Sequence, residues 1–328
     1  MPTAIRVERL TKSFQFAAKD AERGVFKNFF HPEKKTVTAV DAVSFEMEGG
    51  ASVAFIGPNG AGKSTTIKML TGILYPTSGT IRVLGLNPQS QRRQLSYKIG
   101  TVFGQRSQLV YNLPVRDSFR LFGKIYELSD NTIASRQKEL VKLFDLDEFF
   151  DQPVRKLSLG QRMRSEIAVS LLHKPEIIFL DEPTIGLDVV AKRNLRETLR
   201  SLNQNDGTTI FLTSHDAGDI EALCERSIVM NDGKIILDEK TEALKRTYLT
   251  QKDIRIELKR PQKDLKIKNA KIIRREGNLV FLSVDTSTHS LNDVLKDILA
   301  TCEVEDMDVE NATLEEIIAH IYKKENDT

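Results

Sequence analysis

The feature that most constrains the fold is a glycine-rich stretch of nine residues, 57–65, which reads GPNGAGKST. An apolar run suited to a buried strand precedes it at residues 51–56, and a helical segment, residues 67–70, follows it. Glycines let backbone amides turn toward phosphate oxygens, and the positive end of the helix adds to the attraction. This context predicts a phosphate-binding loop and not a glycine-rich turn that binds nothing. The loop consists of Gly57, Pro58, Asn59, Gly60, Ala61, Gly62, Lys63, Ser64 and Thr65.

Two side chains of this loop carry groups suited to a nucleotide and its metal ion. Lys63 can reach the β- and γ-phosphates, and Ser64 can offer its hydroxyl to Mg²⁺. We therefore expect a nucleotide with Mg²⁺ at this loop.

Two adjacent carboxylates follow a second apolar run, residues 177–180. In open α/β sheets ligands bind at the carboxyl ends of the strands, which is where Asp181 and Glu182 stand. We expect Asp181 to hold Mg²⁺, directly or through water, and Glu182 to polarise the attacking water as general base. Alone, such a pair is equally typical of a helix cap or a solvated turn. Its combination with the phosphate-binding loop favours the catalytic interpretation.

The remaining pattern up to residue 245 is that of a layered α/β domain. Apolar runs at residues 51–56, 176–180 and 208–212 are suited to buried parallel strands and alternate with helical patterns. Residues 231–233, Asn-Asp-Gly, predict a hairpin because Asp-Gly tolerates positive φ. We assign residues 1–245 to this domain.

The pattern of apolar and polar residues changes from about residue 251. Alternating strand patterns at residues 254–258 and 279–284 are followed by two amphipathic helical patterns, 291–299 and 314–322, the second behind a capping box of Thr313 and Glu316. We expect a small accessory α+β domain over residues 251–328. The acidic stretch 303–316 is interpreted as a solvated face, with an acidic docking surface as the alternative.

Composition excludes several classes of protein. The 48 basic and 46 acidic side chains of the 328 residues nearly cancel, and no clustered basic stripe for nucleic acid is present. Cys224 and Cys302 alone cannot build a disulfide framework or a cysteine-rich zinc site. No apolar run approaches the roughly 18 to 20 residues that span a bilayer. We expect a cytoplasmic protein whose contact with the membrane is peripheral.

A family resemblance emerges at residues 157–161, Leu-Ser-Leu-Gly-Gln, which resemble the signature motif of ABC ATPases. Other motifs of that family follow the expected order. Gln105 resembles the Q-loop glutamine, Asp188 the aspartate of the D-loop, and His215 the switch histidine. The resemblance spans roughly residues 3–240. It implies a P-loop NTPase fold of ABC type, with a mixed sheet core, a helical subdomain and N-terminal antiparallel strands, and ATP and Mg²⁺ as cofactors.

The resemblance also implies roles for these residues. Gln105 would sense Mg²⁺ and the attacking water and report to a membrane subunit, and His215 would contact the γ-phosphate. Two copies would associate head to tail, so that Ser158, Gly160 and Gln161 close on the ATP held by the other copy. Asp188 would tie the two sites together. Serine before a helix is also a typical N-cap, and we expect Ser158 to serve both purposes.

Two departures from the family pattern bear on the site. The adenine-stacking aromatic is commonly tyrosine, and Phe14 is the best candidate here, with Phe16 or a residue of the following insertion as alternatives. Residues 15–36 exceed the short hairpin usual at that place. We interpret them as an extra hairpin, with an interfacial contact to lipid or permease as the alternative.

Within the family, the chain looks most like the free-standing ATPase subunits of bacterial ABC-2-type exporters, which act with separate membrane-spanning permeases. Residues 103–109 resemble one bacterial branch of that group. An importer ATPase subunit is the first alternative, because it would carry the same motifs. A soluble ABC ATPase of DNA repair or translation is the second. A protein that binds ATP without hydrolysing it is disfavoured by the presence of Glu182 and His215.

Overall fold

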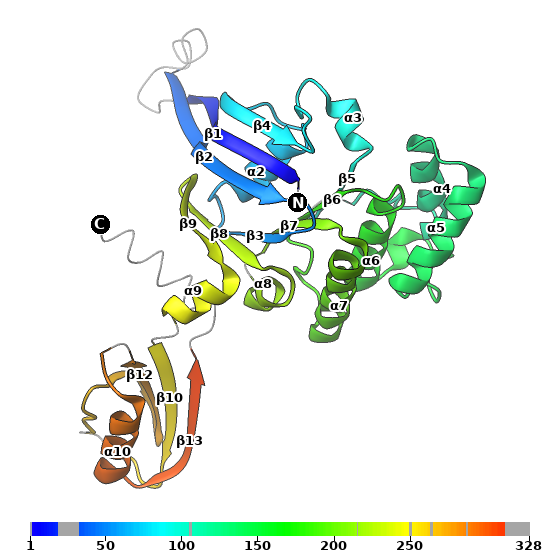
Figure 1. Cartoon of the computed structure of the whole chain (residues 1–328). Helices are drawn as coiled ribbons and strands as arrows, with labels where there is room; N and C mark the ends of the chain where they lie inside the picture. The colour runs from blue at the N-terminus through cyan, green and yellow to red at the C-terminus, as the bar shows by residue number, and fades with distance from the viewer. Residues whose placement is uncertain are drawn as a thin grey trace. The chain divides into compact units, whose positions relative to one another are not determined.

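The computed structural model describes residues 2–18, 33–104, 107–214, 216–248, 251–262, 265–286 and 288–311. Gln105, His215, the centre of the 15–36 insertion and the helix predicted at 314–322 lie outside these ranges. The chain divides into two compact units, Met1–Glu239 and Lys240–Thr328 (Figure 1). None of the helices in the described ranges is long and apolar enough to span a bilayer.

A six-stranded sheet forms the centre of the first unit. Its strand order is β5-β6-β7-β3-β8-β9. The first five strands of this order, from β5 through β3 to β8, pair in parallel. The predicted apolar runs become its buried strands, and the predicted Asp-Gly turn joins β8 to β9 with positive φ at Asp232 and Gly233. The bounds are β3 (Ser52–Ile56), β5 (Ile99–Phe103), β6 (Ile177–Asp181), β7 (Thr209–Thr213), β8 (Arg226–Asn231) and β9 (Lys234–Lys240).

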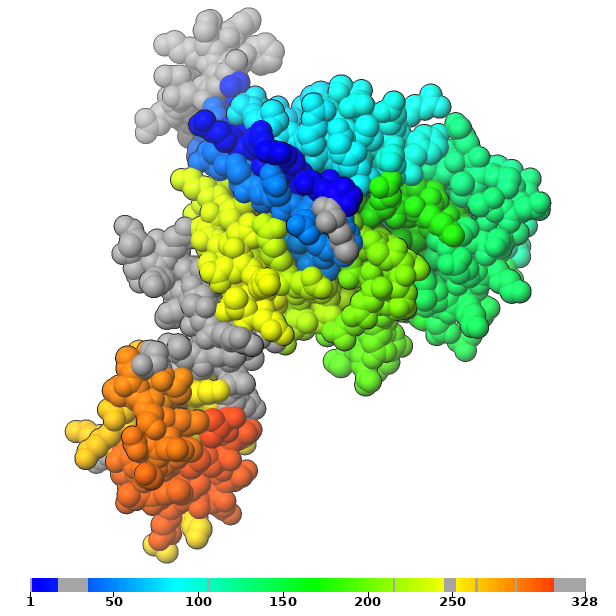
Figure 2. Space-filling view, in the orientation of Figure 1, coloured from blue at the N-terminus to red at the C-terminus, as the bar shows by residue number. Residues whose placement is uncertain are grey.

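A second, antiparallel sheet is built from β1 (Thr3–Ala18), β2 (Glu33–Glu48) and β4 (Ser78–Val83) in the order β2-β1-β4. Phe45 of β2 packs on Phe55 of β3, with ring centroids 5.2 Å apart, and Phe55 packs on Phe211 at 5.0 Å. These rings join the two sheets into one core. Figure 2 shows residues of the N-terminal strands, in blue, beside the yellow region that contains β8 and β9.

The described ends of the long insertion continue this second sheet. β1 and β2 stay paired beyond Phe14, through Gln15 and Thr36, as far as Ala18 and Glu33. The hairpin interpretation is therefore confirmed for residues 15–18 and 33–36.

Helices flank the sheets and form a separate subdomain. α4 and α5 lie on the side of the central sheet away from β9 (Figure 1). Phe119 of α4 is fully buried against Phe150. The bounds are α2 (Lys63–Leu70), α3 (Arg92–Ser96), α4 (Val115–Ile125), α5 (Asp130–Leu143), η1 (Val154–Lys156), α6 (Leu159–Ser170), α7 (Val189–Asp206) and α8 (Ala217–Leu223). The predicted core with helical subdomain and N-terminal antiparallel strands is confirmed.

The second unit is an antiparallel sheet with a helix on one face, as predicted for an α+β fold. Ile254, Ile256 and Leu282 from the sheet bury themselves against Val294 and Ile298 of α10. The strand order is β11-β12-β10-β13. The elements are α9 (Thr241–Tyr248), β10 (Gln251–Leu258), β11 (Lys271–Glu276), β12 (Leu279–Asp285), α10 (Leu291–Thr301) and β13 (Val304–Asn311). The domain boundary predicted between residues 245 and 251 stays a prediction.

Two strands of this unit, β11 and β13, were not predicted from sequence. β13 runs through the acidic stretch interpreted as a solvated face, because pairing along β10 overrides the low strand propensity of Asp and Glu. Its acidic side chains Glu305, Asp306 and Asp308 are exposed, so the described part of the stretch forms a solvated edge strand.

Candidate nucleotide site

The glycine-rich loop joins the end of β3 to the start of α2. Gly60 and Gly62 adopt φ values of 89° and 102°, and Gly62 is the N-cap of α2. A β-carbon at Gly62 would stand 2.4 Å from the carbonyl oxygen of Ala39, so only glycine fits there. The loop borders a cavity of about 420 Å³. The cavity is lined by Asn59, Gly60, Ala61, Gly62, Lys63, Ser64, Thr65, Gly104, Asp181, Glu182 and Ile185.

Lys63 is held inside this loop. Its side chain is buried, and the ammonium donates hydrogen bonds to the carbonyl oxygens of Gly57 at 2.6 Å and Pro58 at 3.2 Å. Burial lowers the pKa of Lys63, while the carboxylates of Glu182 and Asp181 act to raise it. The loop thus holds a compact cation at the cavity, which suits the binding of an anionic phosphate.

Asp181 is fixed by hydroxyl groups from two different elements. Ser64 donates a hydrogen bond to Asp181 Oδ1 at 3.1 Å, and Thr213, on the neighbouring strand β7, donates to the same oxygen at 2.6 Å. Hydroxyl and carboxylate oxygens are the hard ligands that Mg²⁺ prefers. Ser64 and Asp181 therefore fit a magnesium site beside the phosphate-binding loop.

Glu182 lies next to Asp181 in a strained backbone conformation. Its φ is 55°, a value uncommon outside glycine, which costs on the order of 1 to 3 kcal/mol and is typical of functional sites. The amide of Glu182 donates to the carbonyl oxygen of Thr213 at 3.0 Å and to its hydroxyl at 3.1 Å. These bonds hold the turn that brings Glu182 to the lining of the cavity.

Among the predicted residues that the structure describes, Ser158, Gly160, Gln161 and Asp188 do not line this cavity. Ser158 is the exposed N-cap of α6: its hydroxyl accepts from the Gln161 amide at 3.2 Å, and Gln161 Oε1 accepts from the Ser158 amide at 2.9 Å. The predicted N-cap role of Ser158 is confirmed. Gly160 lies in the first turn of the same helix. Asp188 is the exposed N-cap of α7, where it accepts from the Ala191 amide at 2.8 Å.

Phe14 lies on β1 and is half-buried. Its ring is 6.3 Å from the ring of Phe16, and the ammonium of Lys12 stands 5.1 Å from its centroid. The structure therefore brings together Lys63, Ser64, Asp181 and Glu182, but not Phe14.

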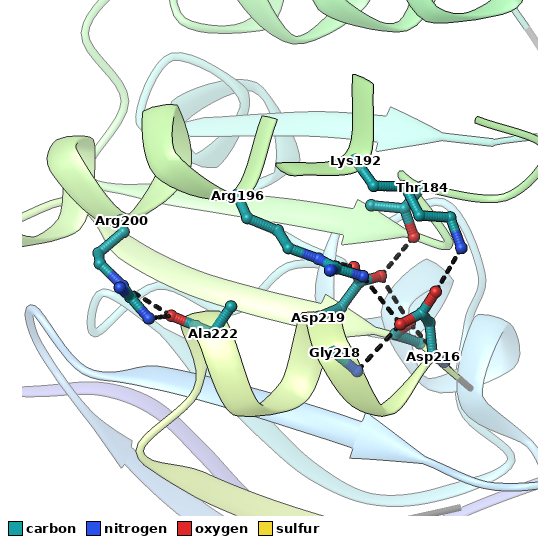
Figure 3. A network of polar contacts seen from close by, with 9 residues as sticks. Thr184, Lys192, Arg196, Arg200, Asp216, Gly218, Asp219 and Ala222 are labelled. Carbon is teal, nitrogen blue, oxygen red and sulfur yellow. Dashed lines mark hydrogen bonds and ion pairs between the residues drawn. The ribbon is translucent and has the colours of Figure 1, made fainter. Parts of the chain in front are cut away.

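A buried polar network that the sequence did not reveal is centred on Asp219 (Figure 3). Asp219 on α8 is fully buried and accepts from Arg196 Nε at 2.7 Å, from the Ser214 hydroxyl at 2.9 Å and from the Thr184 hydroxyl. Thr184 belongs to the segment between Glu182 and Asp188, and Ser214 directly precedes His215. The network ties these two segments to each other. No sequence signal separates Asp219 from an ordinary helix-surface carboxylate.

Asp216 extends the network on the other side of His215. Its carboxylate pairs with Arg196 at 2.8 Å and with Lys192, and it accepts from the Gly218 amide at 2.9 Å (Figure 3). Burial acts to raise the pKa of Asp216, but Lys192 and Arg196 outweigh it and the pKa is lowered. Asp216 is therefore anionic at neutral pH.

A larger cavity, of about 930 Å³, lies elsewhere in the first unit. Its lining includes Lys98, Glu176 and Thr209, at or just before the amino ends of β5, β6 and β7. Ligands of open α/β sheets bind at the opposite, carboxyl edge. The smaller cavity, which holds the predicted residues, is therefore the candidate site.

Known relatives match both the sequence and the fold. The family model described as ABC transporter matches residues 40–185. The ABC transporter ATP-binding protein NatA of Bacillus subtilis is 34% identical over 215 residues, which cover 66% of this chain and 87% of NatA. The Nod factor export ATP-binding protein I of Ralstonia nicotianae is 36% identical over 207 residues, which cover 63% of this chain and 64% of that protein.

Among solved structures, the dimeric post-hydrolysis state of the ATP-binding cassette MJ0796 bound to ADP and Pi matches with a TM-score of 0.61 and 26% identity. The match covers 72% of this chain and 98% of that one. The phosphate-binding loop, Ser158, Asp181 and Glu182 all fall within the range of the family model. The chain therefore belongs to the ABC transporter family, as an ATP-binding subunit that hydrolyses ATP.

Proposed function

We propose that this chain is the motor subunit of an ABC-2-type exporter, coupling ATP binding and hydrolysis to substrate movement through a separate permease. The observation that carries the proposal is the convergence of Lys63, Ser64, Asp181 and Glu182 on one cavity. These groups come from a loop and a strand end more than a hundred residues apart in sequence. Together they supply a cation for the phosphates, oxygen ligands for Mg²⁺ and a general base for water.

Each group has a distinct task in hydrolysis. The inward amides of the loop and Lys63 bind the phosphates and offset their charge. Ser64 and Asp181 would hold Mg²⁺, which supplies further charge neutralisation when bound. Glu182 accepts a proton from the attacking water as general base. We propose that Gln105 and His215, which lie outside the described residues, orient that water and contact the γ-phosphate.

The site is completed by a second copy of the chain in head-to-tail arrangement. Ser158, Gly160, Gln161 and Asp188 do not line the cavity of their own chain. The side chains of Ser158, Gln161 and Asp188 cap helices. Exposed apolar residues surround them, namely Leu159, Ile185, Val189 and Val190. An apolar surface of this kind favours burial against a partner. The similar cassette MJ0796 is dimeric, which supports the association of two copies.

Dimerisation gives ATP a way to do mechanical work. ATP bound to the loop of one copy and capped by Ser158 of the other stabilises the closed pair, and hydrolysis removes that preference. The permease would respond to this closure of the ATPase dimer. We place the chain on the cytoplasmic face of the membrane as a peripheral subunit, without nucleic acid as a partner.

Export is favoured over import by two observations. One of the relatives is named for Nod factor export. The second unit of this chain is a sheet with a helix, whereas ATPase subunits of importers often end in an all-β domain. We propose an accessory role for residues 251–328, and adenine stacking by Phe14 without the hydroxyl that tyrosine would supply.

The test is a pull-down of the tagged full chain from detergent-solubilised native membranes, followed by identification of its partners and a measurement of ATP hydrolysis by the complex. We expect a polytopic permease and ATPase activity that the Glu182→Gln variant lacks. Recovery of ribosomes or DNA without any membrane protein would overturn the transporter assignment. It would favour a soluble ABC ATPase that uses the same catalytic residues.

A further inference from the structure

One buried carboxylate in the helical subdomain has no role in the site described above. Glu166 lies on α6, two helical turns after Ser158, and is 4% exposed. Isolated carboxylates are costly to bury, and burial raises the pKa of Glu166, although hydrogen bonds from Ser107 and Gln108 act to lower it. Such a group is retained where its hydrogen bonds fix a specific arrangement.

The hydrogen bonds to the Glu166 carboxylate come from one loop, residues 107–113, which follows Gln105 and which we call the linking loop. The Gln108 amide donates to both carboxylate oxygens, at 3.2 and 3.0 Å, and the Ser107 hydroxyl donates to one of them. The Ser107 oxygen in turn accepts from the Leu109 amide at 3.2 Å. A carboxylate suits this place because the Ser107 hydroxyl and the Gln108 amide both donate to it.

The same loop is bonded to the segment just before Ser158. The amide of Val154 donates to the carbonyl oxygen of Leu113, and the amide of Arg155 donates to that of Tyr111, both at 3.0 Å. The linking loop is thus attached on both sides of Ser158, through η1 before it and through Glu166 after it. We therefore expect a displacement of the loop to shift the N-terminus of α6.

We propose that Glu166 is a positioning residue that couples the linking loop to Ser158, so that closure on ATP and the position of the linking loop depend on each other. The inference rests on the proposed shared site, because Ser158 acts there on the nucleotide of the partner copy. Glu166 is buried within its own chain, so it cannot act by touching that partner. Coupling of this kind is reciprocal, and typical magnitudes correspond to about 5- to 150-fold in an equilibrium constant.

The test measures ATP-dependent dimerisation of the full chain by analytical ultracentrifugation, in a Glu182→Gln background that retains ATP. Glu166→Gln replaces one acceptor oxygen by a donor facing donors, and Ser107→Ala removes the hydroxyl from the other side. Glu148→Gln, at an exposed glutamate of the same subdomain, is the matched control. Calorimetry at concentrations where the chain is monomeric measures the affinity for ATP separately.

We expect Glu166→Gln and Ser107→Ala each to weaken dimerisation about 5- to 150-fold, with unchanged ATP affinity, and the double variant to lose no more than the stronger single variant. Glu148→Gln should behave like the parent. Unchanged dimerisation in both variants, losses that simply add, or a parallel loss of ATP affinity would overturn the inference. A Glu182→Gln parent that fails to dimerise with ATP would instead refute the proposed shared site, and the inference with it.

Discussion

Lys63 and Asp181 are buried or bonded at the wall of one cavity, whereas Ser158 and Asp188 stand exposed at helix N-termini away from it. The first group, with Ser64 and Glu182, forms what we call the internal half of the site. The second, with Gly160 and Gln161, forms the external half. The internal half is preorganised by contacts within one chain, while the external half is only held in shape by helix caps.

The two halves differ in whether one chain is enough to engage the nucleotide. A preorganised internal half lets a single chain bind the nucleotide. In the proposed dimer, the external half would gain a ligand only when a second copy brings one, so ATP turnover would depend on assembly. Mutations in the two halves should therefore separate ATP binding from ATP-driven association.

The largest expected effect is that of Glu182→Gln in the internal half. Loss of the general base should lower the turnover number by about 10²- to 10⁴-fold, while ATP still binds through the loop and Lys63. The ATP-bound dimer should accumulate, because hydrolysis no longer opens it. Steady-state phosphate release and ultracentrifugation with ATP check both parts. Turnover close to that of the wild type would show that Glu182 is not the base.

Lys63→Ala tests the internal half as a binding site. Removing the cation that faces the phosphates should weaken ATP binding by about 10- to 100-fold, the worth of a charge-assisted hydrogen bond. Isothermal titration calorimetry on the monomer measures it. Lys68→Ala, on the exposed face of the same helix, is the control and should leave the affinity unchanged. Equal affinities in the two variants would contradict the role of the loop.

Ser158→Ala tests the external half. Loss of the N-cap should lower the free energy of unfolding by about 1 kcal/mol and should also weaken ATP-dependent dimerisation, without changing the ATP affinity of the single chain. Ser129→Ala is the matched control, because Ser129 caps α5 by the same hydrogen bond to Thr132. The control should lose similar stability in urea titrations. If both variants dimerise equally, Ser158 is a cap and nothing more.

The smallest expected effect is that of deleting residues 251–328. Neither half of the site uses this segment, and the second unit has its own buried core. ATP affinity by calorimetry should stay at the full-length value, and circular dichroism should show a folded domain. Unfolding of residues 1–250 on truncation would refute the predicted boundary.

The residues of the internal half could all be located from the sequence alone. A strand, a glycine-rich turn with lysine and a helix leave the loop little conformational choice, because only glycine tolerates the φ values found at residues 60 and 62. Asp181 and Glu182 were located by the end of an apolar strand. The N-cap of α6 followed from the local pattern around Ser158. Each of these features depends on neighbours within a few residues.

Tertiary structure alone decided the long-range contacts that no sequence motif marks. Thr213 bonds Asp181 because β6 and β7 are adjacent in the sheet, and hydrophobic periodicity does not encode that order. Asp219 and Glu166 looked like ordinary helix carboxylates, and only the packing of α8 and α6 buries them among donors. β13 became a strand through its pairing with β10. The physical reason is the same in each case: local propensity acts over a few residues, whereas burial and long-range hydrogen bonds depend on the whole arrangement of the chain.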